Sequence, residues 1–479
     1  MAKTTVPEPS VDDAPERVMT RWLWLVGVVI LTAGILFGYD QGVISGALTG
    51  IKKSFHLSTL LVEIVTSWVT LGAMAGSLVA GTIADRFGRR AAVLVAAALF
   101  IVGAIVEGVA PGTTVLVLGR LIVGSGVGVA SVAAPLLAAE MAPTRLRGRF
   151  VSTYQFGITF GIFVAYLIDE LLASDEWRLM LGLASVAGVV LALLTLPLPD
   201  TPRWYLRVGR RSDAERALGR VKRDDPEAAM VELEAHLDED TATASWKEVL
   251  APRWRRPLVI GVGLAVFQQI TGINAIIYYA DKIFGAAGFS SVAGQTAATT
   301  WAIGAVNVLA TLVAIAFVDR LGRKPLLLAG LVGMGVSLTV VGFAFLSLDH
   351  VTRASATAAN AKATGPSDAG IITLVALVVY IASFAFSLGP VVWTMINEIY
   401  PRAVRGRGVA LATAANWFSA WLVSEFFLSV VKRLGESVTF WIFAALCGVC
   451  FVWVRLKVPE TKGRTLEEIE TMWADEASG

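Results

Sequence analysis

A single carboxylate interrupts the first long apolar stretch of the chain. The run WLWLVGVVILTAGILFGY, which begins at Trp22, contains no charged residue, and Asp40 follows before the apolar pattern ends. An unpaired carboxylate is costly in hydrocarbon, so Asp40 needs a cationic partner, a proton or a water-filled cavity. A carboxylate that can lose its partner can also bind a proton, so Asp40 is a candidate for proton coupling.

Arg120, in the sequence LGRLIV, is the expected partner of Asp40. The span that begins near Thr114 runs inward, which places Arg120 about 9 Å below the outer surface. The first span runs outward and ends near Gly46, and the same arithmetic places Asp40 at about the same depth. Protonation of Asp40 would release Arg120 and ease a rearrangement of the helices. A permanent structural salt bridge is the alternative.

Uncharged amides gather in another apolar stretch, FQQITGINAIIYY, which holds Gln268, Gln269 and Asn274. Amides in a membrane usually mark a helix interface or a cavity. On an ideal helix Gln269 and Asn274 point about 140° apart. Gly272 lies between them and permits a break that lets both side chains reach one cavity.

Similar side chains occur singly elsewhere, at Gln155, Asn307, Trp393 and Asn416. Alone, each is more typical of helix packing than of ligand binding. Together they supply hydrogen-bond donors, acceptors and a flat apolar face without a fixed charge. This chemistry suits a neutral polyhydroxylated molecule, whose hydroxyls bond to amides while its C–H face stacks on an indole.

Membrane-spanning helices must position these residues. The chain has 479 residues, of which 56% are apolar and 16% charged, a composition outside the range of ordinary soluble proteins. About twelve windows have the length and apolar character of a span. We predict an all-α membrane protein with spans at residues 23–46, 60–84, 91–109, 114–138, 149–172, 177–197, 257–281, 293–318, 325–347, 370–396, 407–431 and 437–457.

Most of the 40 Lys and Arg residues fall on one side if both termini are cytoplasmic, as the positive-inside rule requires. The chain is therefore expected in the plasma or inner membrane, in contact with lipid. The charged stretch between the sixth and seventh spans contains two amphipathic patterns, around Ser212–Lys222 and at Met230, Leu233 and Leu237. The predicted domains are an N-terminal tail, a bundle, a helical linker, a second bundle and a C-terminal tail, over residues 1–21, 22–200, 201–256, 257–458 and 459–479.

Three motifs occur twice, at matching positions of the two halves. They are DRFGRR (85–90) and DRLGRK (319–324), AAEMAPTRLRGR (138–149) and INEIYPRAVRGR (396–407), and LPDTPRW (198–204) and VPETKGR (458–464). Such repetition predicts two pseudo-symmetric six-helix bundles that rock about a site at the bilayer midplane.

The charged residues of these motifs are expected to pair as a latch between the halves when the cytoplasmic side closes. The alternative is that they only anchor helix ends and fix the topology. The latch residues are Asp85, Arg89, Arg90, Glu140, Arg147, Asp319, Arg323, Glu398 and Arg405.

From Arg21 to about Glu468, the chain resembles the sugar porter family of the major facilitator superfamily. The motifs FGYDQGVISG, DRFGRR, GRLIVGSGVGVAS, PDTPRWYL, QQITGINAIIYY, DRLGRKPLL, GPVVWTMINEIYPRAVRGRG and VPETKGRTLEE carry the resemblance. It implies a gate aromatic at Tyr278, with Tyr279 beside it. It also implies sugar-binding positions at Gln155, Gln268, Gln269, Asn274, Asn307, Trp393 and Asn416.

Two departures from the family pattern bear on the substrate. Asn416 stands where the xylose-type porter has Gln, and Ile162 replaces another Gln, so the pattern favours a hexose over a pentose. Facilitative relatives carry Asn at the position of Asp40, so the carboxylate favours proton coupling. We therefore predict a secondary active transporter that imports a neutral monosaccharide by proton symport. A facilitative uniporter, a pentose or inositol symporter and a transporter-like nutrient sensor are the alternatives.

Other function classes lack their sequence signatures. The chain shows no P-loop, no nucleophile constellation and no His or Cys cluster typical of a metal site, so we expect neither an enzyme nor an ATP-driven pump. No cofactor, metal or nucleic acid is expected. Because each chain contains both bundles, it is expected to function as a monomer.

Overall fold

A computed structural model of the chain describes residues 20–142, 146–172, 174–221, 230–231, 233–234, 246–289, 291–355, 368–401, 404–462, 468–469 and 472–473. The regular secondary structure of these residues is helical. Twelve helical segments are long and apolar enough to cross a membrane, and each overlaps one of the predicted spans. The predicted fold class is confirmed.

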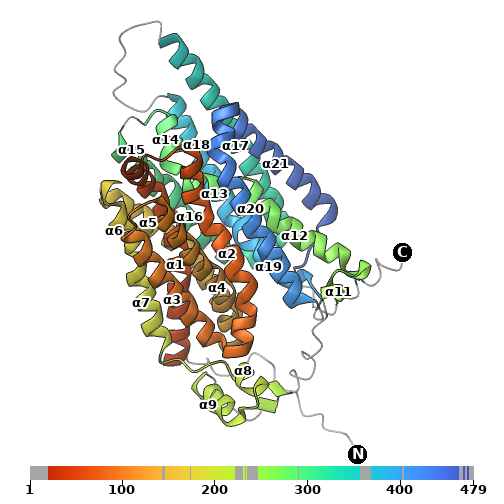
Figure 1. Cartoon of the computed structure of the whole chain (residues 1–479). Coiled ribbons are helices and arrows are strands. Elements are labelled where there is room, and N and C mark those ends of the chain that lie inside the picture. The colour runs from red at the N-terminus through yellow and green to blue at the C-terminus, as the bar shows by residue number, and fades with distance from the viewer. Residues whose placement is uncertain are drawn as a thin grey trace, which may run out of the picture.

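The first six spans form one bundle (Figure 1). Thr20 caps the first helix by accepting a bond from the Leu23 amide, and Ser58 caps the second through the Leu61 amide. The helices of this N-terminal bundle are α1 (Arg21–Phe55), α2 (Thr59–Phe87), α3 (Arg89–Gly108), α4 (Thr113–Met141), α5 (Arg147–Leu171), α6 (Trp177–Gly182) and α7 (Ala184–Thr195).

The last six spans form the C-terminal bundle, in which several spans are interrupted. A π-helix at Thr299–Ala305 precedes α16, and a break at Ser387 separates α18 from α19. Pro390 accounts for this second break, because proline lacks an N–H and crowds the preceding helical turn. The helices are α12 (Arg255–Ile270), α13 (Ile273–Tyr278), α14 (Ala280–Ala286), α15 (Val292–Ala298), α16 (Val306–Leu321), α17 (Arg323–Ser355), α18 (Asp368–Phe386), α19 (Leu388–Ile399), α20 (Arg405–Leu434) and α21 (Glu436–Lys457).

Short helices between the bundles include α8 (Pro202–Arg207), α9 (Arg211–Val221) and α11 (Trp246–Val249). The first predicted amphipathic pattern corresponds to α9, whose Leu218 packs with Met230. Leu237 of the second pattern lies outside the described residues. The helices α8 and α9 lie below the N-terminal bundle (Figure 1).

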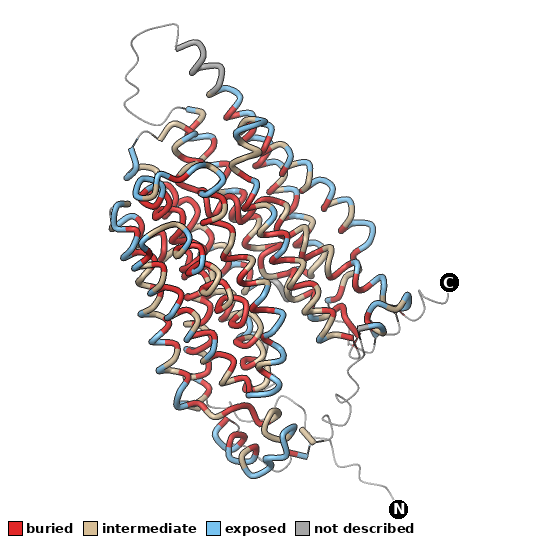
Figure 2. Tube along the Cα trace, viewed as in Figure 1, coloured by how far each residue is buried: buried red, intermediate tan, exposed pale blue. Residues whose placement is uncertain are grey.

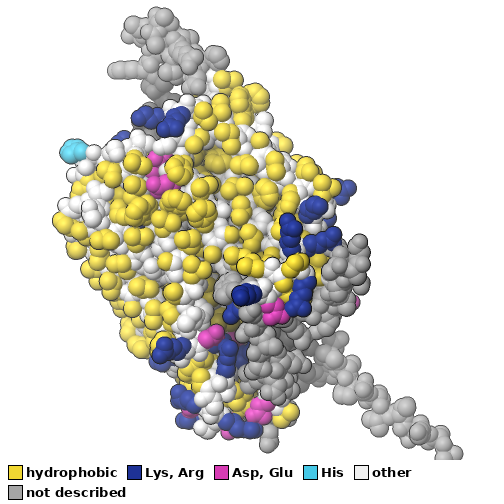
Figure 3. Space-filling model, turned by 45° about the vertical axis from the view of Figure 1, so that its right-hand side comes forward, with side chains coloured by type: hydrophobic (Ala, Val, Ile, Leu, Met, Phe, Trp, Pro, Cys, Tyr) yellow, Lys and Arg dark blue, Asp and Glu magenta, His cyan; other side chains and the backbone are white. Residues whose placement is uncertain are grey.

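Buried residues fill the interior of the helical bundles, while exposed residues face outward (Figure 2). The outward faces are nevertheless rich in large apolar side chains, such as Leu193, Leu309 and Phe343. Figure 3 shows hydrophobic side chains over most of one face, with Lys and Arg toward the ends of the spans. A continuous exposed apolar surface on twelve such helices is what a lipid-facing protein requires.

The bundles contact each other mainly on one side. We call the side where α1 begins and α21 ends the inner side, and the opposite side the outer side. Six hydrogen bonds between described residues of the two bundles lie toward the outer side, including Tyr166 Oη to the Ile277 carbonyl at 2.9 Å. Toward the inner side the two bundles diverge (Figure 1). The structure is therefore in an inward-facing state.

Two hydrogen-bonded carboxylates join α2 to α20 on the outer side. Glu63 accepts bonds from the amide and hydroxyl of Ser429 at 2.6 and 2.7 Å. One helical turn along each helix, Ser67 donates to Glu425. Each bundle thus gives one carboxylate and one serine to the contact, and we call these four residues the outer bracket.

Candidate functional site

The predicted pair of Asp40 and Arg120 is present in the N-terminal bundle. Arg120 Nη1 of α4 lies 2.7 Å from Asp40 Oδ1 of α1, and the two residues are 0% and 2% exposed. The equal depth predicted from helix rise is therefore confirmed. In addition, Arg120 Nε donates to the Val65 carbonyl of α2 at 3.3 Å, so the guanidinium joins three helices.

Glu107, at the outer end of α3, belongs to the same cluster and was missed in the sequence. Its Oε1 lies 3.7 Å from Arg120 Nη1, and the residue is 1% exposed. The signal was available, because Glu107 is the single acidic residue in the apolar run AAVLVAAALFIVGAIVEG. Because Glu107 lies next to a predicted loop, the sequence did not indicate that its side chain points into the bundle.

In the C-terminal bundle, four of the predicted amides form one hydrogen-bonded network. Gln269 Nε2 donates to Asn416 Oδ1 at 3.1 Å, and Asn274 Nδ2 donates to Gln269 Oε1 at 2.8 Å. Asn416 Nδ2 in turn donates to Gln268 Oε1 at 2.7 Å. All four residues are buried, and the bonds join α12, α13 and α20.

Two interruptions of helical backbone make this network possible. Gly272 has φ 101°, a left-handed value that favours glycine, and it separates α12 from α13 as predicted. The break lets Asn274 turn toward Gln269. The second break, before α19, brings the Leu388 carbonyl to 2.8 Å from Gln268 Nε2.

The remaining predicted sugar-binding residues lie outside this network. Asn307 is buried on α16, Gln155 is half-buried on α5 and Trp393 is half-buried on α19. Among the described residues, no side-chain hydrogen bond links any of these three to the four amides. Their expected role in binding sugar remains a prediction.

The predicted gate tyrosines lie where the two bundles meet. Tyr278 of α13 lies close to Asp40, Gln41 and Trp417. Tyr279 donates to the Ser424 carbonyl at 3.0 Å, and its ring stacks on Phe427. Both tyrosines are fully buried at the interface, as expected when the outer side is closed.

Trp417 is a second residue that the sequence reasoning missed. It follows Asn416 directly, and its ring centroid lies 5.5 Å from that of Phe37 on α1. An indole next to a network amide could have been recognised from the dipeptide NW. Trp417 places an aromatic ring from the amide-bearing bundle beside Asp40.

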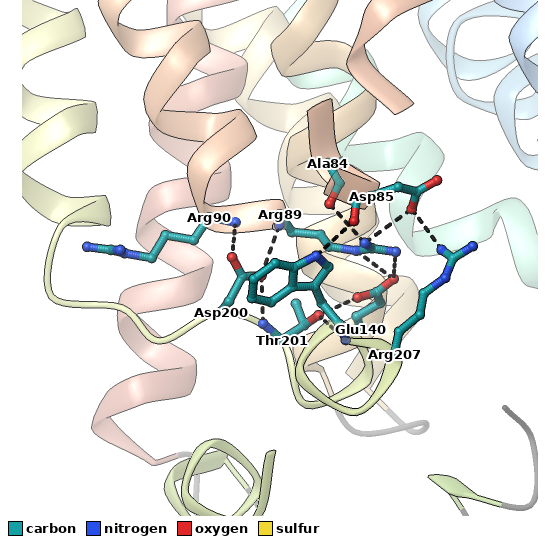
Figure 4. A network of polar contacts seen from close by, with 9 residues as sticks. Ala84, Asp85, Arg89, Arg90, Glu140, Asp200, Thr201 and Arg207 are labelled. Carbon is teal, nitrogen blue, oxygen red and sulfur yellow. Dashed lines mark hydrogen bonds and ion pairs between the residues drawn. The ribbon is translucent and has the colours of Figure 1, made fainter. Parts of the chain in front are cut away.

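The repeated motifs form one polar cluster at the inner end of each bundle. In the N-terminal bundle, Arg89 pairs with Glu140 at 2.9 Å and Asp200 accepts bonds from the Arg89 and Arg90 amides (Figure 4). Thr201 donates to Glu140, and Asp85 pairs with Arg89 and Arg207 (Figure 4).

The C-terminal bundle repeats this geometry. Arg323 pairs with Glu398 at 3.1 Å, Glu460 accepts bonds from the Arg323 and Lys324 amides, and Thr461 donates to Glu398. The positive φ of Gly88 and of Gly322 starts α3 and α17 in the same way. The duplication read from the sequence thus corresponds to two matching sets of contacts.

Each of these contacts joins residues of the same cluster. Arg405 donates to the Tyr400 carbonyl of its own bundle. The side chains of Arg147 and Asp319 lie outside the described residues. The expected latch between halves stays a prediction for the state in which the inner side is closed.

The two matching carboxylates differ in their protonation behaviour. Burial raises the pKa of Asp200, although amide bonds from Thr201, Arg89 and Arg90 oppose it. Burial acts in the same direction on Glu460, but its amide bonds outweigh it and lower its pKa.

The comparisons agree with this architecture. Residues 26–473 match the family model described as Sugar (and other) transporter. The galactose-proton symporter of Escherichia coli (strain K12) is 37% identical over 470 residues, which cover 97% of each chain. A partially occluded inward-open structure of the xylose transporter XylE from E. coli is 28% identical, with a TM-score of 0.78 over 93% of this chain and 99% of that one.

A second structure, of the proton:xylose symporter XylE bound to 6-bromo-6-deoxy-D-glucose, is 30% identical with a TM-score of 0.77 and covers 94% of this chain and 99% of that one. These similarities extend over both bundles and the residues between them. They identify the chain as a membrane transporter with the major facilitator fold and not as an enzyme. The chain belongs to the Sugar (and other) transporter family.

Proposed function

We propose that the chain imports a neutral monosaccharide across the cell membrane by proton symport and alternating access. The observation that carries the proposal is the buried Asp40–Arg120 pair, 2.7 Å apart, at the bundle interface beside the amide network. The similarity to a galactose-proton symporter supports both the sugar and the proton.

The amide network has the chemistry for a sugar. Gln268, Gln269, Asn274 and Asn416 carry no charge, and together they offer several N–H donors and carbonyl acceptors. In this structure they bond chiefly to one another and to backbone carbonyls. A ligand with several hydroxyls can exchange for these bonds without leaving a buried polar group unpaired, whereas an anion finds no cation among them.

Asp40 and Arg120 have the chemistry for coupling to a proton. While Asp40 is ionised, the pair holds α1 against α4. A proton on Asp40 neutralises the carboxylate and weakens this link, so the N-terminal bundle is freed to move. Tyr278 and Trp417 lie close to Asp40, and Trp417 directly follows the network residue Asn416, so a change in the amide network on sugar binding can reach the pair.

The polar contacts of the two ends fit alternating access. In the inward-facing state the outer bracket is closed, and the inner clusters are satisfied within their own bundles. Opening to the outside must break the bracket, and closing the inner side brings the charged motifs together. We propose that Asp85, Arg89, Arg90, Glu140, Arg147, Asp319, Arg323, Glu398 and Arg405 then exchange partners as the latch.

We further propose that the inner side faces the cytoplasm, so that both termini are cytoplasmic, and that the transporter works as a monomer in the plasma or inner membrane. The basic residues near the inner side support this orientation. A hexose is the proposed substrate because Asn416 and Ile162 depart from the xylose-type pattern. Gln155, Asn307 and Trp393 are proposed to complete the sugar site when the bundles close around it.

Proteoliposomes with an alkaline interior test this function. We expect labelled galactose or glucose to accumulate above equilibrium and the accumulation to collapse when a protonophore is added. Equilibration without accumulation would instead support a uniporter. Competition by glucose, galactose, xylose, arabinose and myo-inositol identifies the substrate, and stronger competition by the pentoses would contradict the hexose assignment.

A further inference from the structure

Arg120 lies between two buried carboxylates. Its Nη1 is 2.7 Å from Asp40 Oδ1 and 3.7 Å from Glu107 Oε1. Asp40 Oδ2, Glu107 Oε1 and Arg120 Nη2 have no hydrogen-bond partner among the described residues. Two unused acceptors and one unused donor therefore remain in the same cluster.

The packing of α3 against α4 leaves room for the Glu107 side chain. A Cβ atom on Gly119 would lie 2.6 Å from Glu107 Cγ, and one on Gly103 would lie 2.6 Å from a Val123 methyl. Glycines at both positions let the two helices approach closely. The Glu107 side chain is buried between these helices, with its Oε1 3.7 Å from Arg120 Nη1.

Other polar side chains of the surrounding helices have contacts of their own among the described residues. Arg178 of α6 donates to a backbone carbonyl and lies over the Trp177 ring. Glu63 of α2 belongs to the outer bracket, and Tyr39 of α1 donates to a backbone carbonyl. On α13, Tyr278 lies within electrostatic range of Arg120 but is neutral at ordinary pH.

The charge of the cluster depends on all three residues. Asp40 and Arg120 alone would be neutral without a proton and positive with one. With an ionised Glu107, the cluster is negative without a proton and neutral with one. Because burial disfavours net charge, Glu107 makes the proton-loaded state the one that can be enclosed away from water.

We infer that Glu107 is a positioning residue for proton coupling, an alternative counter-ion that receives Arg120 when Asp40 binds its proton. In this step an O–H bond forms on Asp40, and the ion pair of Arg120 passes from Asp40 to Glu107. The proton comes from a hydronium ion of the outer solvent, whose O–H bond breaks as a water molecule is released. The inference rests on the proposed proton symport.

The pH dependence of sugar accumulation tests the inference. In Glu107→Gln, Asp40 no longer competes for Arg120, so a higher proton concentration is needed to load it. We expect the pH of half-maximal accumulation to fall by about one unit, while sugar exchange at equal concentrations is retained. Glu107→Asp keeps the negative charge, so its pH of half-maximal accumulation should lie closer to that of wild type.

Glu170→Gln is the matched control, because Glu170 is an exposed carboxylate at the outer end of α5. An unchanged pH midpoint in Glu107→Gln would overturn the inference. So would an equal loss at every pH in both the Gln and Asp variants, because that result marks a structural role. Absence of sugar-driven proton movement in wild type would instead contradict the proposed function itself.

Discussion

The two bundles bury polar groups in different ways. The N-terminal bundle buries a charged cluster made of Asp40, Arg120 and Glu107. The C-terminal bundle buries a network of amides, whose donors and acceptors are matched to one another. A matched amide network stays neutral at any pH, whereas a charged cluster changes when a proton binds. In the proposed function, this difference gives proton sensing to the N-terminal bundle and hydroxyl recognition to the C-terminal bundle.

Asp40→Asn removes the carboxylate that binds the proton in the charged cluster, and it has the largest expected effect of the variants. The variant cannot be protonated at this position, so the proton gradient no longer drives uptake. We expect complete loss of accumulation with sugar exchange preserved, measured as counterflow and as uphill uptake in the same proteoliposomes. Undiminished accumulation would remove Asp40 from the mechanism.

Gln269→Ala disrupts the uncharged amide network of the C-terminal bundle. The substitution removes the acceptor of Asn274 Nδ2 and the donor to Asn416 Oδ1, at a cost of about 1–3 kcal/mol. We expect roughly tenfold or greater weakening of sugar binding and an unchanged pH midpoint of the remaining transport. Binding is measured by thermal shift against sugar concentration.

Gln295→Ala is the control for this variant, because it removes a side-chain amide of the same bundle that donates to the Phe289 carbonyl, away from the network. If the Gln269 variant shifted the pH midpoint and left affinity intact, the division of roles between the bundles would be wrong.

Gly272→Ala tests the backbone that supports the network and has a smaller expected effect. A non-glycine residue at φ 101° is strained by about 1–2 kcal/mol, and the added Cβ would lie 2.9 Å from the Phe443 ring. We expect a lower melting temperature and weaker sugar binding. Gly448→Ala, with no atom near the added Cβ, should change neither, and equal behaviour of both variants would refute the role of the break.

Much of this account was accessible from the sequence. The hydropathy pattern and the paired motifs predicted twelve spans in two bundles, because a bilayer imposes length and apolarity on every helix. Asp40 and Arg120 were paired by depth alone. Gly272 predicted the break because few other residues adopt its conformation.

Other features depend on rotation and packing that hydropathy does not encode. Glu107 lies at a helix end, where a glutamate is usually solvated, and only the close contact of α3 with α4 turns it toward Arg120. The orientation of Glu63 and Glu425, the carboxylates of the outer bracket, likewise could not be predicted from hydropathy. The division of inner motifs into two separate clusters follows from the conformational state, which a sequence does not specify.

The most direct test of the division between the bundles is sugar-driven proton movement. Wild-type protein is reconstituted with a pH-sensitive dye in the lumen, and an inward sugar gradient is applied without a pH gradient. We predict acidification of the lumen with sugar uptake in wild type, and sugar uptake without acidification in Asp40→Asn. Sugar uptake by wild type with no change of lumenal pH would contradict the account.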